Sequence, residues 1–193
     1  MPTGDWRTVN FFLRNIAPFT RVKLATQYPL RALDIGVGAG RWGFLFRDCM
    51  EFRADRYFKK DWVYTVDGVE VFEGYRNPVW SYAYDQIVIA DIRNVISEIE
   101  NRKPYDFIFF MDVIEHLPKE EGEQILARLV KRTRNRLILT FPDGNQPESA
   151  LRQGAVHQNE NERHISLWTQ DDLKPYQIVD SEGPCLYALK GGV

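Results

Sequence analysis

The sequence predicts an α/β protein, a three-layer sandwich in which helices cover both faces of a mostly parallel sheet. Two observations carry this prediction. Short apolar runs typical of buried strands alternate with helix-forming segments along most of the chain. Two strand-like segments joined by Glu182-Gly183-Pro184 then end it as an antiparallel hairpin. A length of 193 residues suits one domain, residues 1–193, with a sizeable core.

The first element is an amphipathic helix at Trp6–Ile16, because apolar residues recur there at steps of three and four. Pro18 follows and cannot continue it. We expect residues 1–25 to form an N-terminal helical segment that either packs on the domain or covers its site as a lid.

Seven segments read as strands. They are ALDI (32–35), VYTVDGVEVF (63–72), DQIVIAD (85–91), YDFIFFMD (105–112), RLILTFP (136–142), QIVDS (177–181) and CLYALK (185–190). The third and fourth have the continuous apolar character of strands buried on both faces. Helices are expected at 41–50, in the segment that begins near Pro118, and after Thr169, a plausible N-cap.

The stretch LDIGVGAGRWG (33–43) holds four glycines directly after the first strand. It can be read in two registers, GxGxG from Gly36 or GxGxxG from Gly38. The second is the dinucleotide fingerprint, which requires an acidic residue about 20 positions further on. Asp61 falls near that distance but precedes the second strand, and Glu70 lies beyond it. Both registers stay open on this evidence.

Acidic residues end four successive strands: Asp34, Glu70, Asp91 and Asp112. The carboxyl ends of parallel strands meet at one edge of the sheet, where ligands bind in such folds. Four carboxylates there suit a ligand that offers hydroxyls, an amino group and a ring amine. A single acid after a strand is usually a turn or cap residue, but four in series are harder to explain that way.

Five segments together resemble class I S-adenosylmethionine-dependent methyltransferases. They are LDIGVGAG, GVE (68–70), AD (90–91), DFIFFMDVIEHL (106–117) and LILTFPDG (137–144). The resemblance spans roughly residues 30–190, and the same spacing separates Glu70 from Asp91 and Asp91 from Asp112. It implies a Rossmann-like three-layer sandwich with a seven-stranded sheet. An additional charged and aromatic segment, CMEFRADRYFKKDW (49–62), departs from the family pattern and leaves Asp67 as a rival to Glu70.

The resemblance implies S-adenosylmethionine as cofactor and nine residues that hold it. These are Asp34, Gly36, Gly38, Gly40, Glu70, Asp91, Ile92, Met111 and Asp112. The glycines would let the backbone approach the cofactor, and Asp34 would contact its amino group. Glu70 would accept hydrogen bonds from the ribose hydroxyls. Asp91 would accept one from the adenine amine, with Ile92 against the ring. The last two residues would line the methionyl end.

The long polar segment 143–168 is expected to form the acceptor side of the site, because loops of this length in compact domains are often functional. Its proposed contributors are His157, Asn159, Glu160, His164 and Trp168, together with His116 after the fourth strand. His164, and next to it His157, are candidates for the general base. An equally weighted interpretation is that the two histidines only order the loop.

The function predicted is methyl transfer to oxygen or nitrogen of a small polar acceptor, with a sugar or sugar conjugate as one candidate. The alternatives are an NAD(P)-dependent oxidoreductase and a non-catalytic cofactor-binding protein on the same fold. A net charge of −2 does not favour a nucleic-acid partner. No apolar stretch or signal-peptide core suggests a membrane or export, so a cytoplasmic protein is expected. Histidines and cysteines do not recur at metal-ligand spacing, and no required metal is predicted.

Overall fold

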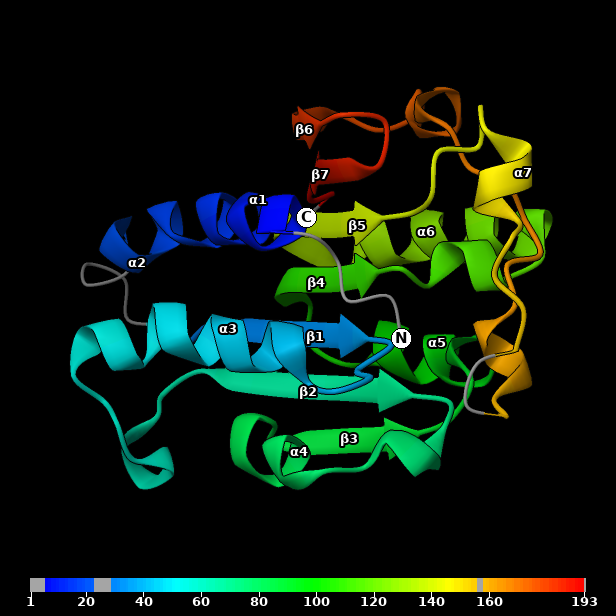
Figure 1. Ribbon diagram of the computed structural model, residues 1–193. Helices are drawn as coiled ribbons and strands as arrows, with labels where there is room; N and C mark the ends of the chain where they lie inside the picture. Colours follow the sequence, from blue (N-terminus) through cyan, green and yellow to red (C-terminus); the bar gives the residue numbers. More distant parts are fainter. Residues whose placement is uncertain (1–5, 23–28, 156–157, 193) are drawn as a thin grey trace.

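The computed structural model describes residues 6–22, 29–155 and 158–192 (Figure 1). Its centre is one seven-stranded sheet in the order β3-β2-β1-β4-β5-β7-β6. The strands are β1 Arg31–Ile35, β2 Thr65–Glu70, β3 Gln86–Ile89, β4 Tyr105–Met111, β5 Thr133–Thr140, β6 Ile178–Glu182 and β7 Leu186–Lys190. The first five run parallel, and β7 is antiparallel to both β5 and β6. The predicted fold class is confirmed.

Helices cover both faces of this sheet. They are α1 Trp6–Ile16, α2 Pro18–Val22, α3 Arg41–Met50, α4 Pro78–Ala83, α5 Ile92–Asn101, α6 Lys119–Lys131 and α7 Pro147–Ala150. Short 3₁₀ turns are η1 Phe52–Ala54, η2 Lys59–Asp61, η3 Glu73–Tyr75, η4 Ile114–His116, η5 Glu160–Glu162 and η6 Gln170–Leu173. Side chains of α1, α3 and α4 share one hydrophobic cluster, and those of α5 and α6 share the other, which makes three layers (Figure 1).

Strand β4 lies at the centre of the core and is buried along its whole length. Phe107 and Phe109 point to the α1/α3 layer, whereas Ile108 and Phe110 point to the α5/α6 layer. This alternation follows from the two-residue period of a strand. Full burial of one such side chain contributes about 1.5–3 kcal/mol. The expectation that the third strand is equally buried is wrong, because β3 is the outermost strand and pairs only with β2.

Helix α1 is packed into the domain. Phe11, Phe12 and Ile16 are completely buried against the sheet. The guanidinium of Arg14 pairs with Asp180 of β6 at 2.7 Å on the exposed side of the helix. The described part of the N-terminal segment is therefore a component of the core, which does not favour a movable lid. In the described residues, no helix is long and apolar enough to span a membrane.

The additional segment after α3 is fixed at the edge of the sheet where β2 begins. The buried carboxylate of Glu51 accepts hydrogen bonds from the backbone N–H groups of Val63 and Tyr64, at 3.1 and 2.9 Å. The fully buried Arg47 donates to Asp85 at 2.7 Å. A buried ionic group is tolerated when its hydrogen bonds are satisfied. The extra residues thus lengthen the sequence before β2 without displacing its other end, where Glu70 lies.

Candidate functional site

A cleft opens at the carboxyl ends of the parallel strands, where ligands bind in open α/β sheets. Its empty volume is about 1070 Å³, part of it open to solvent. The wall includes the glycine loop, the residues that end β2, β3 and β4, and part of the polar segment 143–168, which we call the late loop. The side chains and backbone positions that line it include Gly36, Gly38, Trp42, Glu70, Tyr75, Asp91, Ile92, Arg93, Met111, Asp112, His116, Asn159, Asn161 and Glu162.

The glycine loop between β1 and α3 takes a backbone path that other residues rarely adopt. Gly36, Gly38 and Gly40 have φ angles of 78°, 51° and 85°. These left-handed values cost glycine little. A Cβ on Gly36 would also overlap the side chain of Val113. Gly36 and Gly38 line the cleft, whereas Gly40 lies at the start of α3, just outside the lining residues.

Glu70 ends β2 with its carboxylate at the cleft. One oxygen accepts the N–H of Gly38 and the other the N–H of Phe72, each at 2.8 Å. Each carboxylate oxygen has two acceptor positions, so capacity for further donors remains. Burial raises the pKa of Glu70. Asp67 does not line this cleft and is paired with Arg31 and Tyr105, so the structure favours Glu70 over its rival.

Asp91 follows β3 and caps α5. Its carboxylate accepts the backbone N–H of Arg93 at 2.8 Å and the guanidinium of the same residue at 2.6 Å. Burial alone would raise the pKa of Asp91, but these hydrogen bonds outweigh it and lower the pKa. Asp91 is therefore an ionised carboxylate on the cleft wall, and both of its oxygens already accept hydrogen bonds from Arg93. Ile92, the next residue, lies on the same wall and is largely buried.

Met111 and Asp112 end β4 at the middle of the cleft wall. Asp112 has a φ of 54°, a rare conformation for a residue with a side chain. The hydroxyl of Thr140 donates to its carboxylate at 2.6 Å. Burial raises the pKa of Asp112. Asp112 is thus held on the cleft by the neighbouring strand β5.

Asp34 differs in position from what the resemblance implies. It is completely buried and does not line the cleft. The Tyr84 hydroxyl donates to it at 2.5 Å and itself accepts the N–H of Gly43 at 3.1 Å. Burial raises the pKa of Asp34 to about 7. Asp34 therefore supports the start of α3 from beneath and does not face a ligand.

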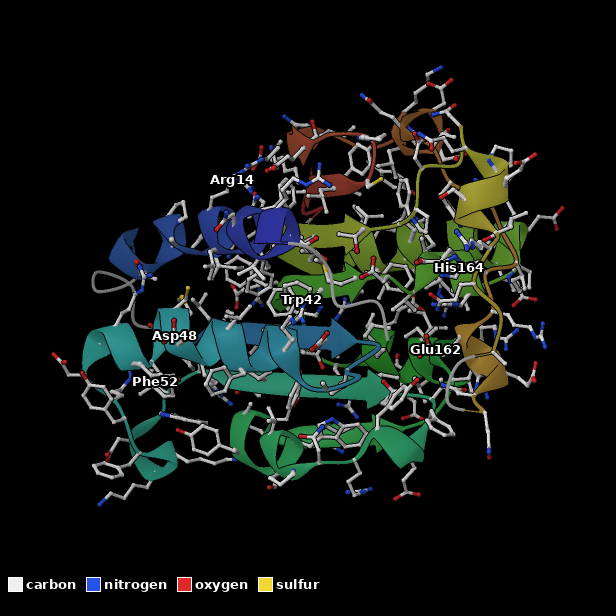
Figure 2. All side chains as sticks on the ribbon, in the orientation of Figure 1. Arg14, Trp42, Asp48, Phe52, Glu162 and His164 are labelled. Carbon is white, nitrogen blue, oxygen red and sulfur yellow. The ribbon has the colours of Figure 1, made fainter. Side chains whose placement is uncertain are left out.

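The late loop closes one side of the cleft. The Tyr75 hydroxyl donates to Glu162 at 2.6 Å, and the amide of Asn159 donates to the same hydroxyl at 3.5 Å. These contacts join the loop to the turn that follows β2. The predicted pocket residue Asn159 lies on the cleft wall. Figure 2 shows Glu162 and His164 at the end of the molecule toward which the parallel strands point.

The two described histidines lie edge to face, with ring centroids 4.9 Å apart. His116 lines the cleft, and its Nδ1 lies 3.0 Å from the carbonyl oxygen of Arg163. His164 does not line the cleft, and its Nδ1 lies 2.5 Å from the carbonyl oxygen of Ala150. The candidate base therefore packs against His116 and has no surface on the cleft. The other candidate, His157, lies outside the described residues.

The structure also places Glu160 and Trp168 away from the cleft. Glu160 is exposed and paired with Arg163 at 2.5 Å. Trp168 is 1% exposed, packs against Phe141 and donates its ring N–H to Ser166 at 2.8 Å. It contributes to the core between the loop and α6. Its indole is one of the largest apolar groups in the segment, and burial of that surface outweighs its suitability as a pocket wall.

Four of the residues that sequence reasoning missed at or beside the cleft are Tyr75, Arg93, Glu115 and Glu162. Glu115 belongs to the Glu-His-Leu trio after β4, so a signal existed, but it was assigned no role. It is 2% exposed, and burial raises its pKa well above the usual range. The other three come from a turn, a first helical turn and a loop. Their side-chain directions depend on tertiary contacts that a periodic pattern does not encode.

Comparison with known proteins identifies the family. A family model described as "Methyltransferase domain" matches residues 10–176. The chain belongs to this methyltransferase family. The resemblance to class I enzymes that use S-adenosylmethionine is thereby confirmed. Family membership favours the GxGxG register of the glycine loop over the dinucleotide fingerprint. A search of curated proteins gave no match.

Solved structures share the fold at low sequence identity. Monomeric WbdD superimposes with a TM-score of 0.63 at 14% identity, over 98% of this chain and 42% of that chain. The plantazolicin methyltransferase BpumL, solved with S-adenosylhomocysteine and a desmethylplantazolicin analogue, gives 0.60 at 15%, over 97% and 86%. Magnesium protoporphyrin IX methyltransferase from Synechocystis PCC 6803, solved with S-adenosylmethionine, gives 0.51 at 13%, over 98% and 84%. The chain thus spans less than half of WbdD, and these likenesses concern the fold.

Proposed function

We propose that the cleft binds S-adenosylmethionine and that the protein transfers its methyl group to oxygen or nitrogen of a small polar acceptor. One observation carries this proposal. The carboxylates of Glu70 and Asp91 line the same cleft as the glycine loop and the Met111-Asp112 end of β4. Family membership supports the reaction class, and this arrangement supports the place.

The cleft residues fit the chemistry of this cofactor. The ribose carries two hydroxyl donors, and Glu70 retains free acceptor positions on both oxygens. Gly36 and Gly38 leave the backbone bare for close approach, and the cofactor has no phosphate that would need cationic partners. Asp91 and Ile92 would hold the adenine, the first through its amine and the second against its ring.

The methionyl end would lie at Met111 and Asp112, next to His116. The cofactor supplies an activated methyl group on a sulfonium, so the main task of the protein is to align the acceptor with it. An acceptor that starts as a hydroxyl needs a base as well. For that role His157 and His164 remain our candidates. In the described structure, His164 would act only after a shift toward the cleft.

The acceptor side suits a hydroxyl-rich molecule such as a sugar or sugar conjugate. Asn159, Asn161 and Glu162 present amides and a carboxylate to the cleft. The amides both donate and accept hydrogen bonds and the carboxylate accepts them, so together they match hydroxyl groups. The neighbouring structures are described with plantazolicin analogues or as acting on magnesium protoporphyrin IX, so the fold itself does not choose the acceptor.

Calorimetric titration with S-adenosylmethionine, S-adenosylhomocysteine and NAD(H) tests the proposal. We expect the first two to bind and NAD(H) not to bind. Glu70→Gln should weaken binding by roughly 10-fold or more, because an amide cannot accept on both sides. The control is Glu73→Gln, an exposed carboxylate paired with Arg76. Binding of NAD(H) alone would reject the proposal. Cofactor binding without turnover on any hydroxyl or amine acceptor would favour the non-catalytic alternative.

A further inference from the structure

A second cluster of polar groups borders the cleft behind His116. Glu115, His116 and His164 each offer a potential ligand atom, and these atoms all lie within 4.8 Å of one another. Two backbone hydrogen bonds hold the cluster together, because the N–H groups of Ile165 and Ser166 donate to the carbonyl oxygen of Glu115 at 2.9 and 3.1 Å. The late loop is thus fixed against the turn that carries Glu115 and His116.

The hydrogen bonds of the two histidines define which nitrogen is free. The Nδ1 atoms of His116 and His164 each lie next to a backbone carbonyl oxygen. A carbonyl oxygen only accepts, so each Nδ1 must carry the proton. In the neutral rings Nε2 is then an unprotonated lone pair. Metal-bound histidines typically show this arrangement, with the second ring nitrogen donating to a carbonyl.

Glu115 has no partner of the kind that a buried carboxylate requires. Neither of its oxygens has a hydrogen-bond partner within the described residues, and the same is true of Nε2 of His164. That nitrogen lies 3.9 Å from one Glu115 oxygen, too far for a hydrogen bond. Glu115 is 2% exposed, so water does not readily replace the missing donors. An unsatisfied nitrogen and an unsatisfied carboxylate thus lie close together without a hydrogen bond between them.

The surroundings of this cluster favour a cation. The carboxylates of Asp112 and Glu162 add negative charge at the cluster. Two imidazoles and a carboxylate form a ligand set that suits Zn²⁺, Co²⁺, Fe²⁺ or Mn²⁺ better than Mg²⁺ or Ca²⁺, which prefer oxygen. Bonds near 2.1 Å place ligand atoms about 3.4 Å apart in a tetrahedral site. Side-chain movements on the order of 1 Å would therefore close the cluster around an ion.

We propose that Glu115, His116 and His164 form a binding site for one divalent transition-metal ion. The three residues leave at least one coordination position unfilled, and the cleft lies on the His116 side. An oxygen of the methyl acceptor would occupy this position next to the methionyl end. This last step rests on the proposed function, whereas metal binding itself does not. With the ion bound, Nε2 of His164 is a ligand, so His157 is then the candidate base. The site explains why two histidines and a glutamate share a buried corner without hydrogen bonds among them.

Titration with Co²⁺ tests the site, because this ion reports its ligand geometry by visible absorption. Untagged protein is first freed of metal with a chelator, and Zn²⁺, Mn²⁺ and Mg²⁺ then compete with the bound Co²⁺. We expect one Co²⁺ per chain, displaced by Zn²⁺ and resistant to Mg²⁺. Glu115→Gln and His164→Ala should each weaken Co²⁺ binding roughly 100-fold, because loss of a direct ligand costs no less than loss of an outer-shell partner, which costs about 10–100-fold. The matched control is Glu123→Gln, because Glu123 is exposed on α6. This variant should bind Co²⁺ as tightly as the unaltered protein does.

Two outcomes would overturn the proposal. In the first, the unaltered protein takes up neither Co²⁺ nor Zn²⁺ and melts at the same temperature with and without them. This outcome does not depend on whether any variant folds. The other is that folded Glu115→Gln and His164→Ala bind Co²⁺ as tightly as the control, which would place the ion elsewhere. Titration of metal-free protein with S-adenosylmethionine separates this proposal from the proposed function, because either can fail while the other holds.

Discussion

At the scale of single residues, the buried carboxyl group of Asp34 makes stability depend on pH. Its pKa is about 7 in the folded protein, against an ordinary value of 3.8. Between these values the native state keeps a proton that the unfolded state has released. The free energy of unfolding should therefore fall as pH rises from about 4 to 7, by up to about 1.4 kcal/mol per pH unit from this group. Above pH 7 its contribution should no longer change.

Asp34→Asn should remove this part of the pH dependence, because an amide does not titrate and still accepts the Tyr84 hydroxyl. Urea unfolding at pH 5, 6, 7 and 8 measures the slope. The variant should lose less stability than the unaltered protein between pH 5 and 7. Asp171→Asn is the control, since Asp171 is exposed. Equal slopes in the unaltered protein and in Asp34→Asn would show that Asp34 is ionised throughout.

Asp91 has two tasks that one substitution can separate. One of its oxygens accepts the N–H of Arg93 at the start of α5, and the other accepts the Arg93 guanidinium and would also accept the adenine amine. Asp91→Asn keeps an oxygen for the cap but replaces the second oxygen by a donor. We expect cofactor affinity to fall by about 1–3 kcal/mol, the cost of an unpaired buried group. The melting temperature should fall only slightly, because the ion pair with the partly exposed Arg93 is worth about 0–1 kcal/mol. Calorimetric titration and a melting curve measure the two quantities.

Glu121→Gln provides the control for Asp91. It removes the second partner of Arg93, at 3.2 Å, and leaves Asp91 unaltered. Its cofactor affinity should match that of the unaltered protein. If Asp91→Asn also bound the cofactor normally, the adenine would have to be held by other groups.

The residue scale also shows which site positions a sequence can predict. Glu70 and Asp91 were found because they end strands, and strand register alone carries them to one edge. Trp168 and His164 were misplaced because their positions depend on the path of an irregular loop. Glu115 was given no role because His164, which lies beside it in the fold, is far along the sequence, although His116 is its neighbour in the chain.

At the scale of elements, the late loop and the turn after β2 are joined by one hydroxyl group. Tyr75→Phe removes both of its hydrogen bonds, to Glu162 and from Asn159. Gln153 then remains as the partner of the Glu162 side chain, at 3.1 Å. We expect cofactor affinity to fall roughly 5-fold, mainly through faster dissociation. This is equivalent to about 1 kcal/mol for the hydrogen bond to Glu162, because the contact from Asn159, at 3.5 Å, contributes little. Stopped-flow dissociation of S-adenosylhomocysteine measures this rate.

Tyr57→Phe is the matched control for this loop contact. Tyr57 is exposed, its hydroxyl donates to Asp55 at 3.1 Å, and neither residue lines the cleft. Its removal should leave the dissociation rate unchanged. Equal rates in both variants would mean that the loop is held by its backbone contacts to Glu115 and not by Tyr75.

Most elements could be predicted because local pattern and tertiary environment agree. The apolar run of β4 matches its position at the centre of the sheet, and the glycine-bounded β1 lies next to it. The edge position of β3 could not be predicted in the same way, because DQIVIAD is equally apolar. Strand order is decided by crossover connections, which leave no periodic signal in the strand itself.

At the scale of the whole molecule, the cleft is built from the ends of strands that also form the core. Binding there should stabilise the complete domain, because a ligand that binds only the native state raises the free energy of unfolding by mass action. At a concentration 100 times the dissociation constant, this amounts to about 2.7 kcal/mol. For a domain of this size we expect the melting temperature to rise by roughly 5–10 °C. S-adenosylmethionine and S-adenosylhomocysteine should both produce this shift, and NAD(H) should not. Differential scanning calorimetry on the unaltered protein and on Glu70→Gln measures it. A shift that Glu70→Gln retains in full would place the ligand outside the cleft, because the strand-end carboxylate would then have no part in holding it.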